Sequence, residues 1–166
     1  MDTADRPVPV PLPLPIELGD SIKEPRPQDC TINGAGWYNY WGPATRPAGA
    51  DACINEGSLS GGTAASRSMN IPGYSNPPYD RGHIIGRQLG GSGSEPGSLF
   101  TQCLGVNRGA MRVFEDKIWK AVTEKKETVY YAVVLGYDSR PIPDTVSVFF
   151  AGSRGSAGSD VFSNVC

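Results

Sequence analysis

Residues 80–91 read DRGHIIGRQLGG and contain His83, the only histidine in a chain of 166 residues. Histidine is the side chain whose ordinary pKa lies near neutrality, which suits it to the transfer of a proton at physiological pH. Alternation along a strand would place His83 on the opposite face from Ile84, which we expect to anchor a hairpin in the core. His83 is therefore the starting point for both the fold and the chemistry.

The segments around this stretch predict a fold of mixed type. Apolar residues recur at helical spacing between Gly109 and Glu127, at positions 111, 114, 118, 119 and 122, which predicts one helix. Farther on, residues 128–137 and 145–152 are β-branched and aromatic runs that predict two strands joined by a turn. Residues 30–79 predict short strands and loops. This order indicates an α+β fold with a central antiparallel sheet and one main helix.

Length and composition predict one folded domain. A chain of 166 residues is close to the usual size of a single domain, and 39% hydrophobic with 19% charged residues is typical of a globular protein. No apolar run approaches the length of a membrane span, so we expect no membrane partner. Residues 1–29 hold seven of the fifteen prolines. They are interpreted as an extended arm or a linker, and residues 30–166 as the domain.

The four cysteines indicate an oxidising compartment. They are an even set without the CxxC spacing of a zinc site, which favours two disulfides over four free thiols in a cytosolic protein. Our guess at the pairing is Cys30 with Cys53 and Cys103 with Cys166, because each bond would tie down a loop-rich end. The expected disulfides predict a secreted protein. Because the N-terminus shows no signal-peptide pattern, we expect that the signal has been removed from the exported form.

Charge is distributed unevenly along the chain. Residues 80–126 hold eight Lys/Arg and five Asp/Glu, a net +3, whereas the rest of the chain has a net −5. A locally basic centre can bind a polyanion even when the whole chain is acidic. A solvated helix face with lysines at positions 117, 120 and 125 would explain part of this excess. It would not explain the arginines, which are candidates for substrate binding: Arg81, Arg87, Arg108 and Arg112.

Glu115 falls within the apolar stripe of the expected helix, where a carboxylate needs a partner. That partner could be an arginine in a structural pair, or a cation beneath the helix. Asn107 offers a neutral oxygen of the kind that Mg²⁺ accepts. On one continuous helix the two residues would be separated by a rise of roughly 12 Å, too far to bind one ion directly. Glycines 105 and 109 therefore predict that Asn107 lies in a turn before the helix, with Glu115 acting through water.

Histidine, a divalent cation and a cluster of arginines together favour metal-assisted hydrolysis of phosphodiesters. The histidine would activate water, the metal would stabilise the leaving oxygen, and arginine would offset charge on the phosphorus. Mg²⁺ is the expected cofactor because the candidate ligands are oxygen atoms, with Mn²⁺ or another divalent cation as an alternative.

The motif DRGH at 80–83, followed by LFTQCLGVNRGAMRVFE at 99–115, resembles the DNA/RNA non-specific endonuclease family. That family belongs to the ββα-metal, or His-Me finger, nucleases, and the resemblance covers roughly residues 78–127. It implies that His83 is the general base and that Asn107 is the one direct protein ligand of Mg²⁺. It also implies that Glu115 holds a metal-bound water.

The resemblance implies further roles and a local geometry. Asp80 and Gln102 would support the site, and Arg81 would hold a substrate phosphate or brace the hairpin. A strand ending near His83 and a second strand at 99–102 would flank a glycine-rich loop, with the helix packed across them. An arginine that stabilises the transition state could come from outside the motif, with Arg67 and Arg154 as candidates.

Three classes of function follow. The first, which we favour, is a secreted endonuclease that cuts DNA and RNA with little sequence preference and, as the resemblance implies, leaves 5′-phosphate ends. The second is a nuclease toxin domain of a polymorphic or contact-dependent secretion system, with an immunity protein as partner. The third is a non-catalytic module that binds nucleic acid. The presence of His83, Asn107 and Glu115 together argues against this third class.

Two further segments allow two interpretations each. The aromatic residues at positions 37, 38, 40 and 41 could stack on nucleic-acid bases, although packing in the core is the commoner role. The loop GGSGSEPG at 90–97 could border a substrate groove or be a tolerant surface loop.

Overall fold

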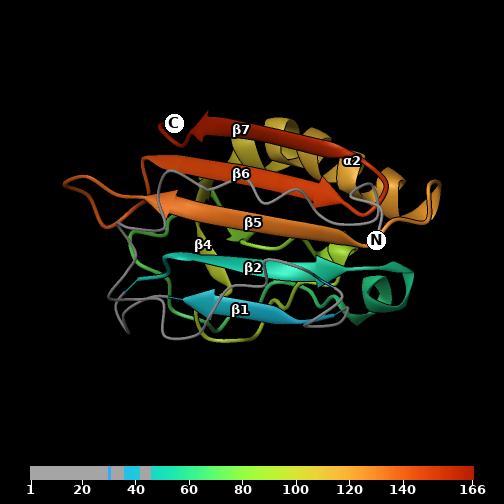
Figure 1. Cartoon of the computed structure of the whole chain (residues 1–166). Coiled ribbons are helices and arrows are strands. Elements are labelled where there is room, and N and C mark those ends of the chain that lie inside the picture. Colours follow the sequence, from blue (N-terminus) through green and yellow to red (C-terminus); the bar gives the residue numbers. More distant parts are fainter. Residues whose placement is uncertain (1–29, 31–35, 42–45) are drawn as a thin grey trace.

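The computed structural model describes Cys30, residues 36–41 and residues 46–166. The proline-rich segment 1–29 lies outside these residues, so its role as arm or linker stays a prediction. The main sheet has five antiparallel strands in the order β1-β2-β5-β6-β7 (Figure 1). These strands are β1 (Tyr38–Trp41), β2 (Gly49–Ile54), β5 (Val129–Gly136), β6 (Thr145–Gly152) and β7 (Ala157–Ser163).

A second, two-stranded sheet and a helix pack together behind the main sheet (Figure 1). The two strands are β3 (Tyr79–His83) and β4 (Leu99–Cys103), which pair in antiparallel register with His83 opposite Leu99. The helix is α2 (Met111–Thr123), and short 3₁₀ helices lie at η2 (Glu56–Gly61) and η3 (Arg87–Leu89). The α+β prediction is confirmed, as are the predicted helix and the two strands that follow it.

The main core forms between one face of the sheet and α2. Alternate residues of β5, including Tyr131 and Val133, face this core, while Tyr130 and Ala132 between them belong to a separate cluster on the opposite face. Phe114 of α2 packs edge-on against Phe150 of β6, with ring centroids 5.5 Å apart. The apolar stripe of α2 is thus buried at Met111, Phe114, Ile118 and Val122, whereas Trp119, which the spacing also assigned to the stripe, is 41% exposed.

The structure corrects the expected position of Asn107. Residues Val106–Ala110 form a π-helical turn, η4, that continues without a break into α2. The N–H of Met111 donates to the carbonyl of Val106, five residues back, instead of four. The expectation of a separate turn before the helix is therefore wrong. A π-helical turn accommodates one more residue than an α-helical turn, and such turns are frequent at functional sites.

Two disulfides join Cys30 to Cys53 and Cys103 to Cys166, which is the pairing guessed from the sequence. The second bond attaches the C-terminus to the end of β4. Asn164, fully buried beside it, completes this attachment. Its Oδ1 accepts from the N–H of Cys103 at 2.9 Å, and its Nδ2 donates to the carbonyls of Thr101 and Pro143. The C-terminal segment is thereby fixed to the strand that leads toward Asn107.

In the part of the chain that the structure describes, none of the helices has both the length and the apolar character needed to cross a membrane.

We expect the substitution Asn164→Ala to destabilise the domain by roughly 2–4 kcal/mol, because it leaves three buried backbone groups without their partner. Chemical denaturation of the oxidised protein measures this free energy of unfolding. Ser163→Ala, at the exposed neighbouring position, is the matched control and should change it by less than about 0.5 kcal/mol. Equal stability of the two variants would contradict the role given to Asn164.

Candidate active site

A cleft of about 610 Å³ opens where β3, η3, η4 and α2 meet. His83 comes from the end of β3, Asn107 from η4 and Glu115 from α2, so three separate elements bring these side chains to one place. The segment 59–62 provides the facing wall. The remaining side chains named as candidates in this cleft are cationic: Arg87, Arg108 and Arg112.

His83 is half-buried, and its ring is held by a backbone carbonyl. Nε2 lies 2.8 Å from the carbonyl oxygen of Thr63. A carbonyl oxygen can only accept a hydrogen bond, so Nε2 must carry the proton in this contact. In the neutral ring the other nitrogen, Nδ1, then has a free lone pair. The contact with Thr63 therefore selects the tautomer in which Nδ1 can accept a proton.

The surroundings of His83 favour its neutral form. Burial is the largest influence and lowers the pKa of His83, and the positive charge of Arg87 lowers it further. The hydrogen bond to Thr63 opposes these effects without reversing them. At neutral pH the ring is thus unprotonated at Nδ1, as a general base requires.

Asp80 determines how Asn107 is oriented. Its Oδ2 accepts a hydrogen bond of 2.9 Å from Nδ2 of Asn107, so the amide oxygen Oδ1 is the atom left to face another ligand. Arg108 donates to both carboxylate oxygens of Asp80, each at 2.9 Å. Burial alone would raise the pKa of Asp80, but the hydrogen bonds from Arg108 and Asn107 and the charge of Arg108 lower it overall. Asp80 therefore stays ionised and holds Asn107 in place.

Glu115 is buried and linked to two other elements. Its Oε2 accepts from the N–H of Gly86 at 2.9 Å and from the hydroxyl of Tyr131 at 3.1 Å. Burial raises the pKa of Glu115 to about 7, although both hydrogen bonds counteract it. Gly86 is required sterically, because a Cβ at this position would lie 2.3 Å from Oε1 of Glu115. With Oε2 engaged, Oε1 is the oxygen that can accept from a water in the cleft.

Gln102 supports the hairpin from behind. It is fully buried in β4, and its Nε2 lies 3.4 Å from the sulfur of Met111. A Cβ on Gly82 would lie 2.2 Å from Oε1 of Gln102, so the glycine of the DRGH motif is needed for this close approach. The contact packs β3 and β4 closely beneath His83.

Arg81 lies apart from the cleft. It donates to the carbonyl of Met69, and its guanidinium stacks over the ring of Tyr74 at 4.3 Å from the centroid. With Arg67 it lines a separate hollow on the other side of Asp80. The sequence left two interpretations of Arg81, phosphate binding and bracing of the hairpin. Its contacts favour the second. Arg154 lies in the turn between β6 and β7 and does not line the cleft.

Sequence reasoning missed three groups that hold the site. They are the carbonyl of Thr63, the N–H of Gly86 and the hydroxyl of Tyr131. The first two are backbone groups, which no residue type can reveal. Tyr131 stands in a strand of apolar and aromatic residues, where nothing distinguishes a ring that donates to a buried carboxylate.

The arrangement combines three chemical capacities in one cleft. A neutral imidazole can accept a proton, an amide oxygen with a buried carboxylate nearby suits a hard cation that keeps several waters, and three arginines can hold phosphate. The described residues contain no group of three or more histidine, cysteine or carboxylate side chains placed to bind a metal.

Comparison with known proteins identifies a family and a fold. Residues 31–151 match the family model described as DNA/RNA non-specific endonuclease. The chain resembles the crystal structure of NucA from Streptococcus agalactiae with magnesium bound, at 19% identity and a TM-score of 0.70 over 81% of this chain and 75% of that one. The Sda1 nuclease with bound zinc gives 18% identity and a TM-score of 0.67 over 80% and 75%. No curated protein matches the chain.

The pKa of His83 can be measured directly, since NMR signals of the only imidazole in the chain need no residue assignment. We expect it to lie below the ordinary value of about 6.5, because burial and Arg87 both disfavour the charged ring. Arg87→Gln should raise it by removing the nearby positive charge. Lys117→Gln, which removes an exposed charge outside the cleft, should leave it unchanged. A pKa that rises equally in both variants would contradict the local effect of Arg87.

Proposed function

Because the chain belongs to the DNA/RNA non-specific endonuclease family, we propose that it hydrolyses phosphodiester bonds of both DNA and RNA in a metal-dependent reaction at the His83 cleft. The observation that carries this proposal is the meeting of three features in one cleft. A histidine with a free Nδ1, an oriented amide oxygen and three arginines all line it.

His83 acts as the general base in this proposal. Nδ1 takes a proton from a water molecule whose oxygen attacks the phosphorus, while Nε2 stays bonded to Thr63 and keeps the ring in place. The bond from phosphorus to the 3′-oxygen breaks, so the phosphate remains on the 5′ end. The 3′-oxygen leaves and is protonated from solvent, and the imidazolium then returns its proton to solvent.

The donor set of the cleft fits a divalent cation. Asn107 would hold it through Oδ1, the atom that Asp80 leaves free, and Glu115 would hold one of its waters through Oε1. When bound, such a cation supplies stabilisation of the charge that develops on the leaving oxygen. Mg²⁺ suits this set of oxygen ligands, with Mn²⁺ as an alternative.

The arginines in and near the cleft would contact the phosphates of the substrate. Arg87 and Arg112 are exposed and directed to the cleft, where they would hold substrate phosphates on either side of the scissile bond. Arg108 is partly committed to Asp80 and adds positive charge beside Asn107. Arg81 would brace the hairpin through its contacts with Met69 and Tyr74, while Arg67, which lines the same neighbouring hollow, would contact the backbone of a longer substrate.

We also propose that the enzyme is secreted and that residues 30–166 form one nuclease domain. Two disulfides support the first part, because such bonds persist in oxidising compartments. The family match over residues 31–151 supports the second.

Cleavage of plasmid DNA and of a structured RNA tests the function, each with Mg²⁺ and with EDTA. Wild type should degrade both only with the metal, and His83→Ala should lower the rate by about 10²–10⁴-fold, the usual contribution of a general base. Asn107→Ala should need more Mg²⁺ for half-maximal rate, whereas Asn70→Ala, an exposed asparagine outside the cleft, should behave as wild type. Full activity in EDTA, or in His83→Ala, would refute this mechanism.

Phosphate contacts by the cleft arginines should make binding depend on salt. We expect Arg87→Gln and Arg112→Gln each to lower the slope of log affinity against log salt concentration by roughly 1, since each removes one phosphate contact. Binding of single-stranded DNA to His83→Ala at several salt concentrations measures the slope. Lys117→Gln carries the same charge change outside the cleft and should leave the slope close to that of the parent. Equal slopes for all variants would exclude these arginines as phosphate contacts.

A further inference from the structure

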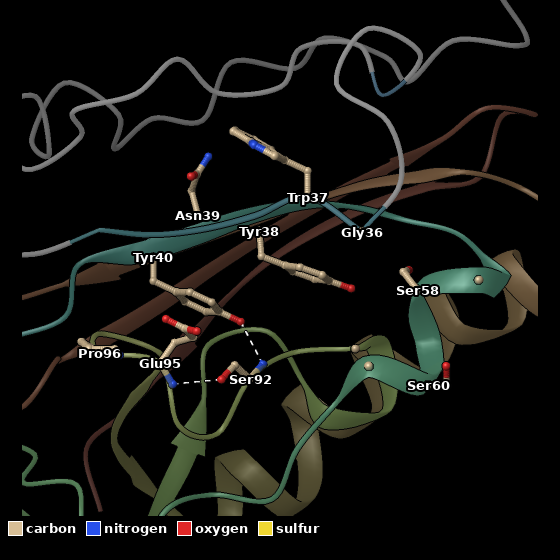
Figure 2. A pocket seen from close by; sticks show the side chains of 13 residues that line it. Gly36, Trp37, Tyr38, Asn39, Tyr40, Ser58, Ser60, Ser92, Glu95 and Pro96 are labelled. Carbon is tan, nitrogen blue, oxygen red and sulfur yellow. Dashed lines mark hydrogen bonds between the residues drawn. The ribbon is translucent and has the colours of Figure 1, made fainter.

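Another hollow, of about 780 Å³, shares Ser60 with the cleft. Figure 2 shows the residues that line it. One wall is the edge strand β1, another is η2, and the third is the loop that contains Ser92 and Glu95. We call it the tyrosine hollow, because Tyr38 and Tyr40 project into it. None of the side chains proposed for catalysis lines it, and the mechanism proposed above makes no use of it.

The two tyrosine rings are held in place on the same side of β1. Residues two apart on a strand are separated by roughly 6.6 Å and point to the same face, and Figure 2 shows both rings directed into the hollow. The hydroxyl of Tyr38 donates to the carbonyl of Leu89 at 2.9 Å, and that of Tyr40 accepts from the N–H of Ser92 at 3.1 Å. Rings fixed in this way offer a binding surface without a further loss of rotamer freedom.

The charge of the hollow excludes a phosphate as its main ligand. Among the described residues that line it there is no lysine or arginine, and Glu95 is the one charged side chain. Burial raises the pKa of Tyr40 to about 12, so this ring also stays neutral. The neighbouring cleft, with its three arginines, has the opposite character. A planar, uncharged group with hydrogen-bonding edges suits aromatic rings surrounded by serine hydroxyls.

Two chain segments connect the hollow to the cleft. Ser60 of η2 lines both, and Gly62, just beyond η2, lines the cleft. In the same way Arg87 and Gln88 of η3 line the cleft, and Gly90, which follows η3, lines the hollow. Arg87 and Gly90 are three residues apart, a separation of roughly 6 Å in 3₁₀ geometry, so the two spaces are close neighbours along one surface.

We propose that the tyrosine hollow is a subsite that stacks an unpaired nucleobase of the substrate next to the scissile phosphate. The proposal rests on the nuclease function proposed above and adds to it a preference for substrates with unpaired bases. A base in a duplex is stacked on its neighbours and is not free to enter, whereas a single strand can turn one base out. The rings recognise any base, because every base has a flat face.

Kinetics on a short single-stranded oligonucleotide test the subsite. Tyr40→Leu and Tyr38→Leu should raise KM by about 5- to 150-fold each, the range equivalent to losing the stacking of one base. Tyr40→Phe and Tyr38→Phe keep the aromatic face and should stay much closer to wild type. An oligonucleotide with abasic sites should be cut equally well by wild type and the leucine variants.

Two controls separate stacking from damage to the fold. Bis(p-nitrophenyl) phosphate is a phosphodiester without a base, and all four variants should cleave it at the wild-type rate. Tyr137→Leu removes a half-buried ring that lines neither space and whose hydroxyl donates to the carbonyl of Pro47, and it should leave KM for the oligonucleotide unchanged. A second measurement needs no cleavage. The fluorescence of 2-aminopurine in the oligonucleotide should fall when the oligonucleotide binds to wild type in EDTA, but not when it binds to Tyr40→Leu.

The outcomes distinguish the two proposals. If wild type cuts the oligonucleotide and the leucine variants match it in KM and in fluorescence loss, the subsite is overturned while the nuclease function stands. If wild type cuts neither substrate with any divalent cation, the nuclease function fails, and the fluorescence measurement still decides whether Tyr40 stacks a base. A loss in the leucine variants that is equal on the base-free substrate also overturns the subsite.

Discussion

One buried carboxylate joins the three parts of this molecule. Glu115 stands on α2, accepts from the backbone of Gly86 just after β3, and accepts from Tyr131 in the central strand β5. A buried charge without partners is strongly destabilising, so these contacts make the position of the helix, the hairpin and the sheet mutually dependent. The same residue lines the cleft, so the proposed chemistry would depend directly on the contact that positions the elements around it.

Asp80 also connects two elements, β3 and η4, but through fewer parts of the fold than Glu115. It lies in the DRGH motif but reaches η4, where it holds the amide of Asn107 and the guanidinium of Arg108. Its negative charge lies beside the cationic cleft without cancelling it, because Arg87 and Arg112 remain exposed. An acidic chain can in this way present a local positive surface to a polyanion, and steering by such a surface depends on the local charge.

The cleft and the tyrosine hollow differ in the chemistry that they offer. The cleft has arginines, an imidazole and an amide oxygen, all suited to a phosphate and its surroundings, while the hollow has neutral rings and hydroxyls. Contacts to phosphate are independent of base sequence, and stacking on a ring is nearly so. A site assembled from these two kinds of surface would tolerate many sequences, in agreement with the family description of a non-specific endonuclease.

The sequence by itself determined the main helix, the two strands that follow it and the residues proposed for the site. Helical spacing located α2, and β-branched runs located β5 and β6. The sequence spacing of His83, Asn107 and Glu115 identified residues that the structure places in one cleft. Only the tertiary structure decided that Asn107 lies in a π-helical turn, that Arg87 lines the cleft while Arg81 stacks on Tyr74 outside it, and that Thr63 selects the tautomer of His83. The physical reason is that periodicity and residue chemistry can be seen in a short stretch of sequence. The backbone partners of a side chain and its direction depend on segments that are distant in the sequence.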